Sequence, residues 1–185
     1  MGGFALRERQ EQELACRARR GDREALEELI ALLYPAVFAY FYKNTGSYHG
    51  SKDLTQEVFI RMAAGIARYR PIKPFKSWLF AIASNQLKNH WRTLARRREG
   101  PLPCPEPAGR DPALAGIEEQ AVLKAALGRL PPEQKEALIL RFYCGFALRE
   151  IAGITGAAES TVKARIRYGL EKLRKELTCD EPCKP

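Results

Sequence analysis

The amino-acid sequence predicts an all-α protein: two small helical domains joined by a linker rich in proline and glycine, the second domain containing a helix-turn-helix. Apolar residues recur every three or four positions in both halves of the chain, which is the period of an amphipathic helix. No segment alternates apolar and polar residues as a half-buried strand would. Residues 99–116 hold five prolines and three glycines, a density that blocks helix formation.

This proline-rich stretch sets the expected domain boundaries. Residues 1–98 form the first domain, residues 99–116 the linker and residues 117–178 the second domain, with a tail over residues 179–185. We expect the linker to be partly extended and partly flexible.

Three helices are expected in the first domain. The first covers residues 21–44, with Asp22 at its N-cap and acidic residues in its first turn. Pro35 is expected to bend or split this helix. Residues 45–51 are predicted to form a loop, and residues 53–69 a second helix.

The third helix follows a break at residues 70–77 and runs from Trp78 to Arg98. Its apolar side chains recur at helical spacing and predict a buried face. Its second half carries positive charge and no acid. The helix therefore combines a face that holds the domain together with a face that attracts a polyanion. The apolar residues are Trp78, Leu79, Ile82, Ala83, Leu87, Trp91 and Leu94, and the cations are Lys88, Arg92, Arg96, Arg97 and Arg98.

The second domain ends in the pattern of a helix-turn-helix. Residues 117–130 are predicted to be helical, and residues 131–144 begin with proline where a first turn tolerates it. A short helix over 147–154 and a long basic helix over 159–177 follow, separated by a tight turn at Gly156. The second helix of such a motif enters the DNA major groove. An ordinary helical hairpin with a basic solvated face has the same pattern, so this alternative stays open.

The charge of the chain suits a nucleic-acid partner. The net charge is +9, from 31 basic and 22 acidic side chains. Residues 1–100 hold 18 basic and 10 acidic side chains, a net of +8, and the remaining residues hold 13 and 12, a net of +1. A basic surface attracts polyanions, although a charge that serves only solubility is the alternative.

Composition argues against an exported or membrane protein. The apolar runs are shorter than the ~20 residues that a membrane helix needs, and the first twenty residues lack the apolar core of a signal peptide. The five scattered cysteines argue against a disulfide framework. We therefore expect a cytoplasmic protein with no membrane insertion. Cys179 and Cys183 in the tail form either a redox or metal-binding thiol pair or part of a disordered tail.

The sequence contains no motif for catalysis. It has no glycine-rich phosphate loop, no nucleophile elbow and no Cys/His spacing for a catalytic metal. We therefore expect no enzymatic activity, no cofactor and no metal.

Three motifs carry a family resemblance. They are DLTQEVFIRM from Asp53, FKSWLFAIASNQLKNHWR from Phe75, and LPPEQKEALILRFYCGFALREIAGITGAAESTVKARIRYGLEKLR from Leu130. In order and spacing they resemble bacterial RNA polymerase sigma factors of the extracytoplasmic-function (ECF) type, over about residues 20 to 178. A stand-alone helix-turn-helix transcriptional regulator is the alternative; it would bind duplex DNA alone and need not bind polymerase.

The resemblance implies a division of labour between the domains. The first domain would bind core RNA polymerase and the melted minus-ten element, and the second would bind the minus-thirty-five element as duplex. An anti-sigma factor would be a further partner. The polymerase contacts would be Asp53, Gln56 and Glu57; the minus-ten contacts Asn85, Lys88, Arg92, Arg96 and Arg97; and the minus-thirty-five contacts Ser160, Thr161, Lys163, Arg165 and Arg167.

Several of these residues have a structural alternative. Asn85 is the residue expected to hydrogen-bond a flipped base, in a pocket formed with the loop Arg68–Ser77; the alternative is a buried amide satisfied by backbone. Asp53 could instead complement the helix dipole. Trp91 is expected to be a core aromatic residue.

Two positions depart from the family pattern. Ala147 and Ala158 stand where the two helices of the motif usually begin with a serine or threonine cap. Loss of a cap costs ~1 kcal/mol. We therefore expect Lys163 and Arg165 to contribute more to upstream-element binding than the helix start does.

Overall fold

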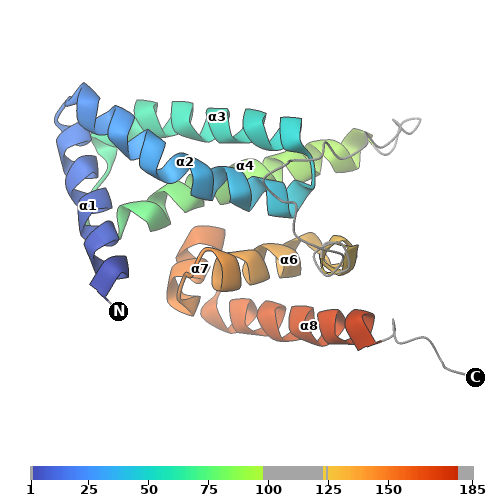
Figure 1. Cartoon of the computed structure of the whole chain (residues 1–185). Helices are drawn as coiled ribbons and strands as arrows, with labels where there is room; N and C mark the ends of the chain where they lie inside the picture. The colour runs from blue at the N-terminus through green and yellow to red at the C-terminus, as the bar shows by residue number, and fades with distance from the viewer. Residues whose placement is uncertain (1, 98–122, 124, 179–185) are drawn as a thin grey trace, which may run out of the picture. The chain divides into compact units, whose positions relative to one another are not determined.

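The computed structural model describes residues 2–97, 123 and 125–178, and within them it is all-helical in two compact units (Figure 1). The predicted fold class is confirmed. The linker over 99–116, most of the helix expected over 117–130, and the tail with its two cysteines lie outside the described residues. The proposed domain boundaries therefore stay predictions.

The first domain contains four long helices and one short 3₁₀ turn. In chain order they are α1 (Gly2–Arg19), α2 (Arg23–Thr45), α3 (Tyr48–Gly65), η1 (Ile66–Arg68) and α4 (Phe75–Arg97). Helix α2 packs against α1, α3 and α4. Its residues Leu29, Leu33, Val37 and Phe41 are fully buried. Although α2 is long and apolar enough to cross a membrane, this burial identifies it as the core helix of the domain.

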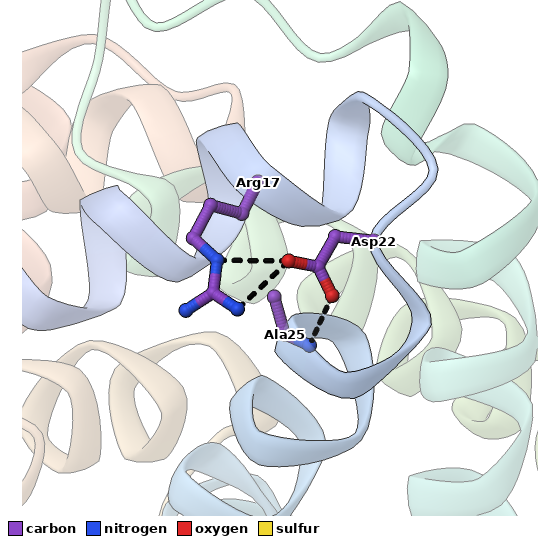
Figure 2. A network of polar contacts seen from close by, with 3 residues as sticks. All are labelled: Arg17, Asp22 and Ala25. Atoms are coloured by element: carbon purple, nitrogen blue, oxygen red, sulfur yellow. Dashed lines mark hydrogen bonds and ion pairs between the residues drawn. The ribbon is translucent and has the colours of Figure 1, made fainter.

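Asp22 begins α2 as predicted (Figure 2). Its carboxylate accepts a hydrogen bond from the Ala25 backbone N–H at 3.0 Å and binds the Arg17 guanidinium at 2.8 Å. These two contacts, with the backbone bond the larger, lower the pKa of Asp22 below its usual range. The cap thus ties the start of α2 to the end of α1.

Other details of the first domain differ from expectation. Helix α1 was not predicted. Helix α2 is not split at Pro35 but continues through it, because buried residues on both sides hold the two halves. Residues 45–51 are not a loop: only Gly46 and Ser47 separate α2 from α3. Ser47 caps α3 by accepting the Gly50 N–H at 3.1 Å.

The second domain is a helix-turn-helix supported by a preceding helix. Its elements are α6 (Pro132–Leu138), the π-helical turn η3 (Ile139–Tyr143), α7 (Leu148–Thr155) and α8 (Glu159–Thr178). Gly156 makes the tight turn with a φ of 69° and donates its N–H to the Ala152 carbonyl. The expected core residues of the motif are buried: Ile151, Ile154, Val162 and Ile166.

Helices α6 and α8 cross closely. They pack against each other, and Gly169 of α8 lies at the crossing. A Cβ atom there would be 2.9 Å from Cδ1 of Leu138, a buried residue of α6. The absence of a side chain at Gly169 therefore permits the approach of the two helices.

Candidate nucleic-acid interface

Helix α4 presents one polar stripe to solvent. Asn85, Asn89, Arg92 and Arg96 follow one another at intervals of four, three and four residues, and all four are exposed. Arg92 donates to the Asn89 side-chain oxygen at 3.1 Å. The opposite face of α4 is buried in the domain core through Leu79, Phe80, Ala83 and Leu87. The helix therefore has the two faces that the sequence predicted, except that Leu94, expected on the buried face, is exposed.

The structure places the other predicted residues of α4 differently. Because Asn85 is exposed, it is not a buried amide. Lys88 and Trp91 are half-buried on the flanks of the stripe. The side chain of Arg97 lies outside the described residues.

The segment before α4 is fastened at both ends. The Tyr69 hydroxyl donates to the Lys73 carbonyl at 2.7 Å and lies 3.1 Å from Oε1 of Gln12. The same Gln12 oxygen accepts the Phe75 N–H at 3.1 Å. Arg19 donates to the Tyr69 carbonyl at 3.3 Å. Burial raises the pKa of Tyr69, so its hydroxyl stays protonated to a higher pH than that of an exposed tyrosine.

An aromatic cluster lies beneath this segment. The rings of Tyr69, Phe75 and Trp78 have centroids 5.1–5.4 Å apart. Aromatic pairs in this range contribute about 0.5–1.5 kcal/mol beyond the area they bury. The cluster joins the end of η1 to the first turn of α4.

Helix α3 carries the acidic face that the sequence predicted. Asp53 and Gln56 are exposed, whereas Glu57 is half-buried and its carboxylate binds Arg61 at 2.7 Å. Ile60 continues the line of Asp53 and Gln56 and is 63% exposed. The sequence analysis missed Ile60, although an apolar residue on the polar face of an amphipathic helix is a readable signal.

Helix α8 presents a second polar face. Val162, Ile166 and Gly169 are buried, and Ser160, Lys163 and Arg167 are exposed on the other side at intervals of three and four residues. Thr161 is also exposed. These positions fit a helix whose outer face meets DNA.

Arg165 does not share this outer face. At about 100° per residue it lies about 60° from buried Val162, and its side chain is 23% exposed. Its guanidinium binds the Glu133 carboxylate of α6 at 3.0 Å. Arg167, by contrast, lies over the Tyr168 ring at 4.7 Å and 3.8 Å from the Glu171 carboxylate.

In the structure, an alanine stands at the start of each of the two helices of the motif. Ala147 is the N-cap of α7, and its backbone N–H donates to the Glu150 carboxylate at 2.9 Å, which is half of a capping box. Ala158 directly precedes α8. Neither alanine offers a hydroxyl for the orphan N–H groups of its helix or for a phosphate.

Two family models match the chain in order. The model for Sigma-70 region 2 matches residues 16–97, and the model for Sigma-70 region 4 matches residues 120–173. The first match begins near the end of α1 and runs through α2, α3 and α4, and the second covers α6, η3, α7 and most of α8.

Individual proteins give the same result. The ECF RNA polymerase sigma factor SigE of Mycolicibacterium smegmatis is 34% identical over 83% of this chain, and the match spans 63% of that protein. EcfG of Rhodopseudomonas palustris, also an ECF RNA polymerase sigma factor, is 31% identical over 85% of this chain and 87% of its own length. The Bartonella quintana sigma factor RpoE, solved with the anti-sigma factor NepR, is 26% identical with a TM-score of 0.73, over 84% of this chain and 98% of that chain.

Proposed function

The chain belongs to the ECF family of RNA polymerase sigma factors, and from this premise we propose how its two domains divide the work of transcription initiation. The protein is an alternative sigma factor: it binds core RNA polymerase and directs it to specific promoters. The observation that carries this function is the ordered match to region 2 and region 4 within one chain. A stand-alone helix-turn-helix regulator would not account for the region 2 match.

The first domain binds core polymerase through α3. Asp53 and Gln56 supply exposed polar groups, and Ile60 supplies an apolar contact at the end of the same line. Glu57 is less available to the polymerase than Asp53 because Arg61 already binds its carboxylate. An acidic patch on a basic protein suits a basic protein partner.

The first domain also binds the minus-ten element through α4. Arg92 and Arg96 contact phosphates, which gives affinity without sequence information. Asn85, a neutral donor and acceptor on the same stripe, hydrogen-bonds an unstacked base of the melted strand. Lys88 adds positive charge beside this stripe, and Arg97 is kept among the contacts on the family resemblance alone.

The second domain binds the minus-thirty-five element as duplex. Ser160, Lys163 and Arg167 line the outer face of α8 and reach the major groove, with Thr161 beside them. Arg165 can contact DNA only by giving up Glu133.

The remaining partners and properties follow from the family. Since the similar RpoE was solved with an anti-sigma factor, we expect this chain also to be inhibited by one. Sigma factors act by binding, so the chain itself catalyses no reaction. We place it in the cytoplasm, where polymerase and promoters are.

Run-off transcription tests the function. Purified core polymerase, given a promoter library, should produce discrete transcripts only when this protein is added. The selected promoters should share two elements. If core polymerase with the protein transcribes no more than core alone, while the protein binds duplex DNA by itself, the regulator alternative is correct.

A charge-reversal pair tests the docking face. Asp53→Lys with Glu57→Lys should lower core affinity on the order of 100-fold, because like charges across an interface cost several kcal/mol. The matched control is Glu24→Lys with Glu28→Lys, which changes the net charge equally at exposed positions of α2. Equal affinities of the two double variants for core polymerase would refute the docking assignment.

A further inference from the structure

We propose that Arg61 is a positioning residue that couples polymerase docking on α3 to DNA recognition on α4. Its guanidinium joins Glu57, at the edge of the docking face, to Gln86, the residue that follows Asn85 in α4. The proposal deepens the function proposed above and rests on it, because it requires both core polymerase and promoter DNA as partners.

The first contact of Arg61 lies within α3. Its Nε donates to Oε1 of Glu57, one helical turn away, at 2.7 Å. The side chains of Arg61 and Glu57 are 57% and 43% exposed, so a docked protein can reach the pair. Glu57 lies one turn from Asp53, which is also exposed. A basic partner that binds Asp53 is therefore placed to compete with Arg61 for the Glu57 carboxylate.

The second contact of Arg61 reaches across to α4. Gln86 is buried, with 8% of its surface exposed. Its amide oxygen, turned toward α3, accepts hydrogen bonds from Nε of Arg61 and, at 3.3 Å, from Nη2 of the same guanidinium. The opposite orientation of the amide would place its NH₂ group against a guanidinium that can only donate. Arg61 thus satisfies a buried polar group of the neighbouring helix, which would cost free energy if left unpaired.

One N–H group is shared between the two acceptors. Nε of Arg61 faces both Glu57 and Gln86, and the charged carboxylate is the stronger acceptor. When a polymerase cation neutralises Glu57, the guanidinium can donate fully to Gln86 and hold α4 more firmly against α3 beside Asn85. A held site loses less freedom when DNA binds. Because such coupling is reciprocal, DNA bound on α4 strengthens polymerase binding by the same factor.

The test measures this coupling as a ratio of affinities. The full-length protein is titrated with core polymerase, either with a selected promoter fragment already unpaired at the minus-ten element or with an unrelated duplex of equal length. The coupling ratio is the Kd with the unrelated duplex divided by the Kd with the promoter. Arg61→Ala should lower this ratio about fivefold or more, the usual lower bound for coupled sites. With the unrelated duplex, Arg61→Ala should bind core at least as tightly as the parent, because Glu57 is released; a general loss of folding would weaken both affinities.

Substitutions of Gln86 test the second contact. Gln86→Leu removes the acceptor at similar volume and should lower the coupling ratio as Arg61→Ala does. The double variant should be no worse than either single variant, since both changes break one contact. Gln86→Glu keeps an oxygen acceptor and should retain the coupling ratio of the parent.

The control is Arg23→Ala, which breaks the same kind of ion pair, Arg23–Glu27 at 3.0 Å, on the exposed surface of α2. It should leave the coupling ratio unchanged. The coupling role is wrong if Arg61→Ala keeps the parent's ratio, or if it weakens core binding equally with both fragments. Additive losses in the double variant, or a lost ratio in Gln86→Glu, would also overturn it.

Failure of the coupling and failure of the proposed function give different results. A parent protein that binds no core polymerase would refute the function itself. A parent that binds core and directs transcription, but with a coupling ratio of one, would refute the role of Arg61 alone.

Discussion

Helices α4 and α8 are both basic, yet their cations have different neighbours. On α4, Arg92 and Arg96 are exposed and form no ion pair with a described residue. On α8, Arg165 binds Glu133 and Arg167 lies 3.8 Å from a Glu171 oxygen. Cations without carboxylate partners bring their full charge to phosphates, whereas paired cations must exchange one anion for another. We therefore expect arginines to provide long-range attraction to DNA on α4 and pre-positioned contacts on α8.

The largest expected difference between the helices concerns non-specific affinity. Arg92→Ala with Arg96→Ala should weaken binding to unrelated DNA on the order of 100-fold at low salt, and should reduce the salt slope by about one unit for each phosphate that is no longer neutralised. Arg165→Ala with Arg167→Ala should weaken binding to unrelated DNA less and reduce the salt slope less, because both arginines already have anionic neighbours. Fluorescence anisotropy across a salt series measures both. Equal slopes for the two pairs would remove the distinction between the helices.

Within α4, base contact and phosphate contact should separate. Asn85→Ala should lower opening of a matched promoter about tenfold, the value of a hydrogen-bonded base contact. Affinity for unrelated DNA should stay within about twofold, because a neutral amide releases no counterions. Permanganate footprinting and anisotropy give the two values. A parallel decrease in both assays would mean that Asn85 has no role in base recognition.

On α8, the Glu133–Arg165 pair should limit what Arg165 contributes. Arg165→Ala should relax preference at one or two positions of the upstream element, near the lower end of the 1–3 kcal/mol range for bidentate base contacts. Glu133→Gln should instead raise affinity for duplex a few-fold, since the Glu133 side chain is 68% exposed and ion pairs with such an exposed partner are worth about 0.2–1 kcal/mol. Binding-site selection with each variant measures the preference. Unchanged selection by Arg165→Ala would mean that Arg165 only holds α8 against α6.

We expect that the start of α8 can be stabilised without a change in the DNA bases that the helix prefers. Ala158→Ser would supply the missing cap and stabilise the second domain by up to ~1 kcal/mol. Amide hydrogen exchange in the first turn of α8 should slow, with Ala157→Ser as the neighbouring control. A change in the preferred bases, rather than in protection, would show that the hydroxyl contacts DNA.

The smallest expected effect contrasts the charged cap of α2 with the uncharged start of α8. Because the folded-state pKa of Asp22 is lowered, its contribution to stability is present above its ordinary pKa and is lost as the pH falls through the lowered value. Between about pH 5 and about pH 2 the parent should therefore lose more stability than Asp22→Asn. Thermal melts across this range measure the difference. Parallel pH profiles would show that the cap acts without its charge.

The sequence predicted helices well where a local signal marks them. Asp22 was identified because an acid before an apolar-periodic segment is a recognisable start. Ser47 is an equally good cap, but Gly46 before it and Gly50 after it made residues 45–51 read as a loop. Helix α1 was missed because small residues supply much of its buried face: Ala15 and Ala18 pack inward with Leu14.

The residue types of the candidate interface could be predicted from the sequence. The ion pairs that these residues form were less predictable. The exposed stripe on α4 follows from helical spacing. The Glu133–Arg165 ion pair does not, because it depends on how α6 meets α8. Likewise Gln12 hydrogen-bonds Tyr69 and Phe75, which lie 57 and 63 positions further along the chain. No local sequence pattern predicts such contacts.

The close crossing at Gly169 restricts how the second domain can vary. Replacing a helical glycine by alanine is a common thermostabilising substitution, with a gain of about 1 kcal/mol. Here the added methyl group would overlap Leu138, and overpacking a core typically costs about 1–3 kcal/mol. A larger residue at position 169 is therefore tolerated only with a smaller one at position 138. Among related chains these two positions should covary, although one lies in the supporting helix and the other in the helix proposed to recognise DNA.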